Sequence, residues 1–295
     1  VIGWLDTKLY DATGDERAAQ GWCPTVLDTN GDGVITKPWN EPARGRDTAT
    51  NDASLDTRVV VGSYGVIGDP TDDKAVWISS NRFPGRLARL HVGDNPPETC
   101  LTEIFEVPSV LDDTVPKEKT GFGSRGLDID RDGVIWTALS GSSHFASFDR
   151  TACDVHSGPT TLEGRHCVDG WTLYPTPGPL VKGTDVRADY HYYNWVDQWN
   201  TLGLGENVPI ATGSNSDSLL ALDPETGDWT VLRVPYPRGF FTRGLDGRID
   251  DPQGGWKGRG VWATYGEAAT WHIEGGQGVK PGIVKFQVRP GPLAN

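Results

Sequence analysis

The feature that most constrains the fold is a four-part unit of short strand-like segments that recurs along the chain. Its clearest copy reads GFGSRGLDIDRDGVIWTAL, then SSHFASFDR, then GWTLYPTP. Each segment is rich in valine, isoleucine and aromatic residues and is bounded by glycine, proline or aspartate, which is typical of β-strands. Two Arg-Gly-Leu-Asp sequences, at 125–128 and 243–246, and the runs VWIS, VIWT and VWAT align the copies.

Repeats of four short strands predict an all-β fold, a β-propeller built from four-stranded blades. We expect one domain over residues 1–295, with three full blades and two partial ones, divided as 1–57 (partial), 58–115, 116–185, 186–237 and 238–295 (partial). The first part reads as a blade without its innermost strand, and the last copy stops after GIVKFQVRP. Either the chain is the C-terminal part of a larger propeller, or its ends are capped irregularly. The alternative is a five-bladed ring with frayed end blades.

The composition excludes several classes of protein. Glycine (38 residues) and proline (21 residues) are too abundant for a helical bundle or a doubly wound α/β fold. The net charge of −13 argues against binding to nucleic acid or to anionic lipid, since both need clustered cations. No apolar run approaches the ~20 residues of a membrane helix. Because the chain lacks methionine and a visible signal peptide, we expect a processed or truncated form.

The four cysteines are an even set without the CxxC spacing of metal or redox sites. They favour an exported protein, extracellular or periplasmic, with two disulfides, over a cytosolic protein with four buried thiols. Cys153 and Cys167 flank a polar loop between two strands, so we expect them to pair. Cys23 would then pair with Cys100 between the edges of adjacent blades.

At RGLDIDRDGVIWTALSGSSHFASFDR and LDPETGDWTVLRVPYP the chain resembles the streptogramin lyase-like (virginiamycin B lyase-like) and NHL-type propellers. The shared pattern is Asp-x-Asp-Gly, an aliphatic residue with Trp, a short loop and a strand ending in Asp, over about residues 58–290. The resemblance implies a propeller. The lyases place a His before the inner-strand glycine and a metal-binding Glu and His on the next strands. Here Arg125 and Arg243 precede the glycines and no acid follows Trp136 or Trp262, so the lyase catalytic residues are not matched.

An acidic segment near the N-terminus opens like an EF-hand loop, with oxygen-bearing side chains at alternate positions and a glycine after them. It predicts a Ca²⁺ site whose ligands are Asp28, Asn30, Asp32, the carbonyl of Val34, and Glu41 or Asp47. Trp39 stands where an EF-hand has its closing glutamate, so a metal-free acidic turn is the alternative. The similar run DIDRDG at 128–133 joins two strands of one blade and predicts a hairpin turn.

Arg125 and Arg243 occupy equivalent positions on strands that we expect to be innermost, beside Gly126 and Gly244, which would relieve backbone crowding. Two guanidinium groups near one axis predict an anion site, and ion pairs with nearby aspartates such as Asp128 and Asp246 are the alternative. The run DYHYYNWVDQWN at 189–200 adds a ligand-pocket prediction, unless its aromatic rings pack between blades. The ligand-binding candidates are Arg125, Arg243, Tyr193, Trp195 and Gln198.

Acid–base or transition-metal chemistry would depend on side chains that are far apart in the sequence: His144, His191, His272 and Glu274. The sequence therefore leaves open whether the protein is an enzyme. The first hypothesis is a binding or assembly module whose loop face and funnel take a small anionic or aromatic ligand, a protein partner, or the rest of a larger propeller. The alternative is a metal-assisted lyase or hydrolase with its site in the funnel.

Overall fold

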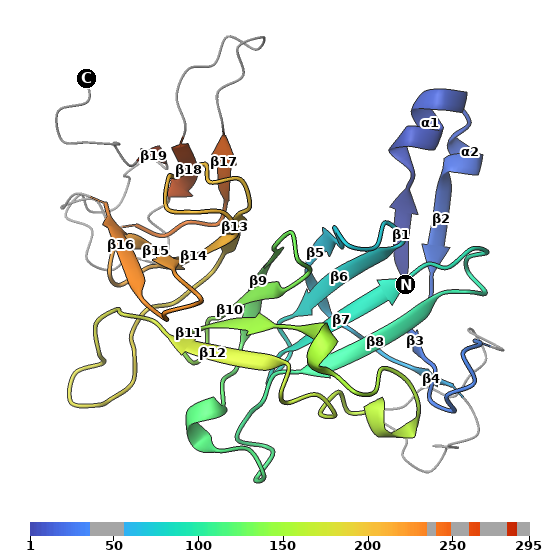
Figure 1. The fold of residues 1–295 in the computed structure, drawn as a ribbon, viewed down its shortest axis with the longest axis horizontal. Helices are drawn as coiled ribbons and strands as arrows, with labels where there is room; N and C mark the ends of the chain where they lie inside the picture. The colour runs from blue at the N-terminus through green and yellow to red at the C-terminus, as the bar shows by residue number, and fades with distance from the viewer. Residues whose placement is uncertain (36–55, 235–239, 249–259, 266–281, 288–295) are drawn as a thin grey trace.

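The computed structural model describes residues 1–35, 56–234, 240–248, 260–265 and 282–287. The repeat forms antiparallel meanders in which strands adjacent in sequence are adjacent in the sheet (Figure 1). Three sheets have four strands and one has three, and the predicted all-β propeller architecture with four-stranded blades is confirmed. The strands are β5 (Ser63–Gly68), β6 (Ala75–Ser80), β7 (Arg86–His91) and β8 (Leu101–Glu106); β9 (Ser124–Ile129), β10 (Ile135–Leu139), β11 (His144–Phe148) and β12 (Trp171–Pro175); β13 (Asn194–Asp197), β14 (Val208–Gly213), β15 (Ser218–Leu222) and β16 (Trp229–Arg233); and β17 (Leu245–Arg248), β18 (Gly260–Tyr265) and β19 (Gly282–Phe286).

A buried aspartate closes the first hairpin of two blades. In the turn between β9 and β10, the Asp130 carboxylate accepts the backbone N–H of Val134 at 2.9 Å and the indole N–H of Trp136 at 3.3 Å. In the preceding blade Asp69 accepts the N–H of Thr71 at 2.9 Å and the indole N–H of Trp77 at 3.0 Å. The DIDRDG run is therefore a turn that also orients the large aromatic side chain of the second strand.

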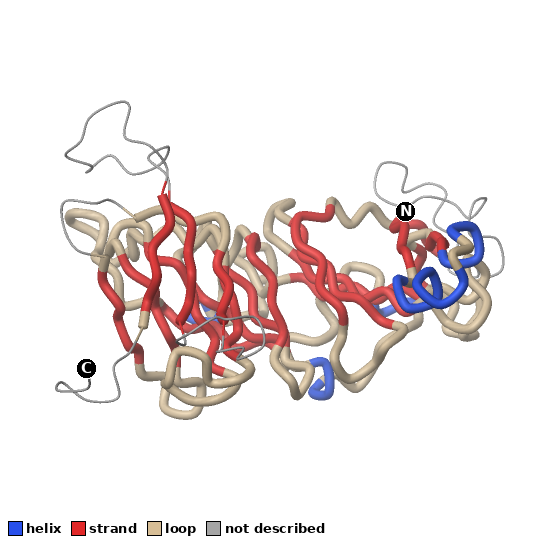
Figure 2. Tube along the Cα trace, turned by 90° about the horizontal axis from the view of Figure 1, so that it is seen from above, coloured by secondary structure: helices blue, strands red, loops and turns tan. Residues whose placement is uncertain are grey.

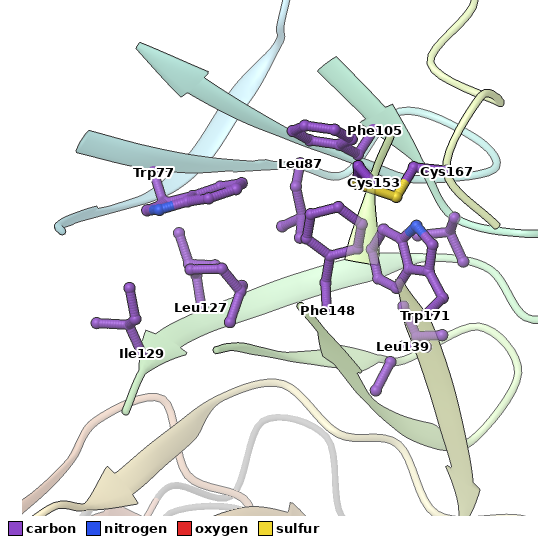
Figure 3. Close-up of a cluster of buried hydrophobic side chains, with 13 residues drawn as sticks. Trp77, Leu87, Phe105, Leu127, Ile129, Leu139, Phe148, Cys153, Cys167 and Trp171 are labelled. Atoms are coloured by element: carbon purple, nitrogen blue, oxygen red, sulfur yellow. A yellow bond between two sulfur atoms is a disulfide. The ribbon is translucent and has the colours of Figure 1, made fainter. Parts of the chain in front are cut away.

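The hydrophobic core lies in layers between successive blades. The layer between sheets β5–β8 and β9–β12 contains aromatic rings in tilted contact, with Phe105 and Phe148 at 4.6 Å and Phe148 and Trp171 at 4.9 Å between centroids (Figure 3). Further layers follow between sheets β9–β12 and β13–β16 and between β13–β16 and β17–β19. This layered burial explains why strands of the central blades, such as β10 and β15, are buried on both faces, because their sheets pack between two neighbours.

The first strand of each blade is the innermost. β9 lies against both β5 and β13, and β13 lies against β17. The residues of the two Arg-Gly-Leu-Asp repeats are thus placed on the inner side of their blades.

The N-terminal segment differs from the predicted partial blade. β1 (Ile2–Leu5) pairs with β2 (Gln20–Cys23), and two short helices, α1 (Thr7–Thr13) and α2 (Glu16–Ala19), connect them. A separate ladder joins β3 (Val26–Leu27) to β4 (Thr57–Arg58), and Gly33–Ile35 form no strand. The helices form because Asp6 and Asp15 cap them, accepting backbone N–H groups at 2.9–3.1 Å, and because Gly14 ends α1 with φ at 66°.

The terminal sheets lie far apart. β1 and β19 are at opposite ends of the molecule in both views (Figures 1 and 2), so the described sheets do not close a ring. The outer face of sheet β5–β8 is instead covered by N-terminal residues, including Ile2, Leu27 and Val61. None of the helices in the described part of the chain is long and apolar enough to cross a membrane.

Two disulfides join the cysteine pairs expected from the sequence. Cys23–Cys100 links residues 77 positions apart and ties β2 to the first full blade. Cys153–Cys167 closes a loop of 14 positions and lies beside the rings of Phe105 and Trp171 (Figure 3). The described residues include no free cysteine.

The crowding expected at the two inner glycines occurs at only one of them. A Cβ at Gly126 would lie 2.3 Å from Asn194 Oδ1 and 2.9 Å from the Cα of Tyr193, because β9 and β13 approach closely there. At Gly244 the nearest atom is 3.5 Å away, so the expected crowding at Gly244 was wrong. The last described sheet has no following blade pressed against that strand.

We therefore expect Gly126→Ala to lower the free energy of unfolding by about 1–3 kcal/mol, because the methyl group overpacks against backbone atoms. The matched control, Gly244→Ala, should change it by less than about 0.5 kcal/mol. Urea denaturation of both variants measures the difference. Equal effects at the two positions would contradict this account of the inner strands.

Candidate ligand-binding site at the propeller axis

The inner strands and the last described sheet line an open cavity of about 820 Å³. Its wall is formed by β5, β9 and β13 together with β17, β18 and β19, so it lies where the blades converge. Its lining includes Val66, Asp128, Tyr193, Trp195, Asp246, Trp262 and Ile283. A cavity of this size fits a small organic ligand.

Aromatic and aliphatic side chains form most of the wall. Tyr193 and Trp195 line the cavity, and they also pack against the core layer between sheets β13–β16 and β17–β19. The sequence posed ligand contact and inter-blade packing as alternatives for these residues. The structure shows the packing, and it also places both residues at the wall of the cavity. Trp262 of β18 and Ile283 of β19 also line the cavity and are 40% and 67% exposed, so the cavity presents apolar surface to solvent.

Two carboxyl groups, Asp128 and Asp246, also line the cavity. Asp128 is buried and accepts the backbone N–H groups of Val196 at 2.6 Å and Ile129 at 2.9 Å. Burial raises the pKa of Asp128 to about 6, and the negative charges of Asp246 and Asp130 contribute in the same direction. Burial, with the charges of Asp128 and Asp246, also raises the pKa of Tyr193.

Beyond the cavity, the two repeat arginines meet at one aromatic ring. The guanidinium carbon of Arg125 lies 5.2 Å from the centroid of Tyr192, and that of Arg243 lies 5.1 Å from it. Further rings lie within 5.5 Å of one arginine or the other. We call this group the arginine–tyrosine cluster: Tyr64, Arg125, Tyr190, Tyr192, Phe241 and Arg243.

The arginine–tyrosine cluster contains two positive charges and no carboxylate. Arg125 donates from Nε to Ser140 Oγ at 3.2 Å, and within the described ranges neither Arg125 nor Arg243 forms an ion pair. Burial raises the pKa of Tyr64 to about 12, so its hydroxyl is neutral at physiological pH. The ion pairs with Asp128 and Asp246 that the sequence offered as the alternative are not formed among these residues.

The rest of the 189–200 run serves the fold. His191 is fully buried, and its ring nitrogens contact the Thr212 carbonyl and Thr176 Oγ1. Asp197 accepts the N–H groups of Thr201 and Leu202, both at 2.7 Å. Gln198, a predicted ligand contact, donates to the carbonyl of Ile129 at 2.8 Å and so ties two blades together.

The predicted acid–base candidates do not assemble into a described site. Burial lowers the pKa values of both His144 and His191, and His144 Nδ1 contacts Ser142 Oγ at 3.0 Å. Where the structure describes the chain, no three His, Cys, Asp or Glu residues are grouped as metal ligands. His272 and Glu274 lie outside the described residues.

The acidic loop is folded around Asp28. Its buried carboxylate accepts the backbone N–H groups of Gly31 at 2.7 Å and Gly33 at 2.9 Å. Asp32 Oδ1 accepts the N–H of Val34 at 2.8 Å, and Asn30 Nδ2 donates to Asp32 Oδ2 at 3.2 Å. The oxygens of Asp28, Asn30 and Asp32 thus fall in one turn, whereas Glu41 and Asp47 lie outside the described residues.

Sequence reasoning missed most of the aromatic residues of the arginine–tyrosine cluster. Tyr64 stands alone in its segment, Phe241 follows Phe240, and neither is part of a motif. The repeat provides a usable signal, because Tyr64, Arg125, Tyr192 and Arg243 all lie at or near the start of an inner strand. Residues at equivalent positions of successive blades meet at the axis.

Comparisons with known proteins return only distant likenesses. No protein-family profile and no curated protein matches the chain. Among solved structures, it is similar to a virginiamycin B lyase from Staphylococcus aureus at 14% identity, covering 79% of this chain and 71% of that one with a TM-score of 0.32. It is similar to a putative 6-phosphogluconolactonase from Bacteroides uniformis at 12% identity, covering 78% and 68% with a TM-score of 0.34.

A third similar structure is the hydrazine synthase of Kuenenia stuttgartiensis, at 9% identity and a TM-score of 0.34. The match covers 60% of this chain, which spans about half the length of that chain, at 47%.

Proposed function

We propose that the protein is an exported propeller module that binds a small carboxylate-bearing ligand at the arginine–tyrosine cluster. The observation that carries the proposal is that Arg125 and Arg243 share the ring of Tyr192 without a carboxylate partner in the described structure. Two guanidinium groups that contact the same ring repel each other, and an anion between them would offset this repulsion, since guanidinium groups bind carboxylates through paired N–H donors.

The surrounding rings favour a ligand that carries an aromatic group beside its carboxylate. Tyr64 and Tyr192 meet edge to face at 6.0 Å, and Tyr190 and Phe241 complete the wall. Such rings add contact area for an aromatic ligand at little cost in side-chain entropy. Aliphatic acids should bind more weakly than aromatic acids.

Export and structural calcium are further parts of the proposal. Two disulfides support an extracellular or periplasmic location, because disulfides persist in oxidising compartments. The turn at Asp28, Asn30 and Asp32 offers side-chain oxygens of the kind that Ca²⁺ prefers. A metal-assisted lyase or hydrolase has no supporting observation among the described residues.

The function is tested with benzoate and acetate as probes in titration calorimetry. We expect benzoate to bind more tightly than acetate, and Arg243→Gln to weaken benzoate binding about 10- to 100-fold, because a hydrogen-bonded charge pair is lost. Arg17→Gln, the same charge change on the exposed helix α2, is the control and should bind as the wild type does. No binding of either probe, or equal binding by Arg243→Gln, would refute the proposal.

Calcium is tested by thermal unfolding. We expect chelator to lower the melting temperature of the wild-type protein, since a ligand present at 100 times its Kd stabilises the folded state by about 2.7 kcal/mol. Asp32→Ala removes one oxygen ligand and should make the melting curve insensitive to Ca²⁺. If the wild-type melting curves with and without Ca²⁺ coincide, the proposed calcium site is refuted.

A further inference from the structure

We propose that the cavity between the inner strands is a second binding site, which takes an organic ammonium group. Two carboxyl groups, Asp128 and Asp246, and three aromatic rings line this single cavity of about 820 Å³; the rings are Tyr193, Trp195 and Trp262. Aromatic faces attract cations through their ring quadrupoles, and a carboxylate supplies the counter-charge. This is the combination that recognises an alkylated or aryl-substituted ammonium ion.

The two carboxyl groups have no cationic partner in the part of the chain that the structure describes. The ion pairs found there involve other acids, and Asp128 is held only by the backbone N–H groups of Val196 and Ile129. Lys285 lies over the ring of Trp262 at 5.6 Å but is not among the described residues that line the cavity. A bound cation would relieve the mutual repulsion of Asp128, Asp246 and Asp130.

The chemistry of the wall favours an organic cation over a metal ion. Ca²⁺ takes six to eight oxygen ligands, whereas the lining offers two carboxyl groups among mainly apolar residues. The exposed apolar surfaces of Val66, Trp262 and Ile283, which are 58%, 40% and 67% accessible, would contact the substituents of the ammonium nitrogen. Burying these surfaces favours a bulky quaternary ion over a small hydrated one.

This site is distinct from the proposed carboxylate site. In each Arg-Gly-Leu-Asp repeat the arginine and aspartate are three residues apart, so their positions are separated by ~10 Å along the strand. The cation site does not depend on the proposed function, because each site has its own probe and its own variants.

Ammonium binding should strengthen as the pH rises. The pKa of Asp128 is about 6, and the titratable groups that contribute to its field are Asp246, Asp130 and Tyr193, none of which is cationic. At pH 7.5 Asp128 is ionised and attracts the ligand, whereas at pH 5 it is mostly protonated. Binding should therefore be several-fold tighter at pH 7.5 than at pH 5.

The test is titration of the full chain with benzyltrimethylammonium, followed by calorimetry and tryptophan fluorescence. Benzyl alcohol is the neutral probe of similar shape, and CaCl₂ is the metal control. We expect benzyltrimethylammonium to bind at least 10-fold more tightly than benzyl alcohol and to change tryptophan fluorescence. Asp246→Asn and Trp262→Ala should each weaken its binding about 10-fold.

Asp113→Asn, the same charge change at an exposed position, should leave ammonium binding unchanged. Benzoate binding should be the same in wild type and Asp246→Asn, which separates this site from the proposed function. If benzoate fails to bind but the ammonium probe binds as described, the proposed carboxylate site is refuted and the ammonium site is not. Equal affinity for benzyltrimethylammonium and benzyl alcohol, or wild-type binding by Asp246→Asn, would overturn the ammonium site.

Discussion

Replacing Cys23 and Cys100 together by alanine is expected to lower the free energy of unfolding by about 4.5 kcal/mol. The disulfide joins residues 77 positions apart, and the loss of chain entropy in the unfolded state grows with the length of the closed loop. Both cysteines are fully buried, and they pack with Leu90, Ile2 and Val76. Chemical denaturation of the double variant and the wild type measures the difference.

The Cys153–Cys167 pair is the matched comparison, since it closes a loop of only 14 positions. Chain entropy alone predicts a smaller loss of about 3 kcal/mol for its double alanine variant. Its sulfur atoms, however, lie in the aromatic layer with Phe105, Phe148 and Trp171 (Figure 3). A larger loss for this pair than for Cys23–Cys100 would show that packing outweighs loop length.

Much of the blade architecture was predictable because the same pattern of strands and turns occurs in several units of the repeat. Segments such as VWIS and VIWT occupy the same place in their units, and the structure has them as β6 and β10. The aspartate that precedes each of them orients the tryptophan in both blades. Local turn chemistry and strand patterning therefore agree, which makes this part of the fold readable from one sequence.

The N-terminal segment was not predicted because its apolar residues resemble strands while its caps specify helices. Asp6, Asp15 and Gly14 begin and end two helices that together span little more than ten residues. Helices this short leave no periodicity over three turns, so only the capping residues could have revealed them.

At the candidate site, the repeat identified Arg125 and Arg243 as binding residues but did not identify the aromatic rings that contact them. One possibility weighed from the sequence, an ion pair between Arg125 and Asp128, is not formed in the described structure. The register between β9 and β10 shifts between Ser124 and Leu127, and such a β-bulge changes the direction of the side chains beside it. The alternation of a regular strand therefore does not predict where Arg125 lies relative to Asp128. The rings that contact Arg125 come from other blades, and the angle between blades cannot be read from the sequence of any one of them.

The acidic cavity also makes stability depend on pH. The pKa of Asp128 is near 3.8 in the unfolded chain and about 6 in the folded protein, mainly because the carboxyl group is buried. Between these values the folded protein holds a proton that the unfolded chain has released. The contribution of Asp128 is therefore fully present below pH 4 and is lost as the pH rises through 6, amounting to about 3 kcal/mol.

Asp128→Asn removes this titration while keeping the size and the hydrogen-bond acceptor of the side chain. The amide can satisfy only one of the N–H groups of Val196 and Ile129, and that cost does not depend on pH. The free energy of unfolding of the variant, taken relative to wild type, should therefore rise by about 3 kcal/mol between pH 3.5 and pH 8. Urea denaturation at these two pH values gives the difference directly. A relative stability that stays constant across this range would mean that Asp128 is ionised as readily in the folded protein as in the unfolded chain, and the cavity would then lack the desolvated carboxyl group that its geometry implies.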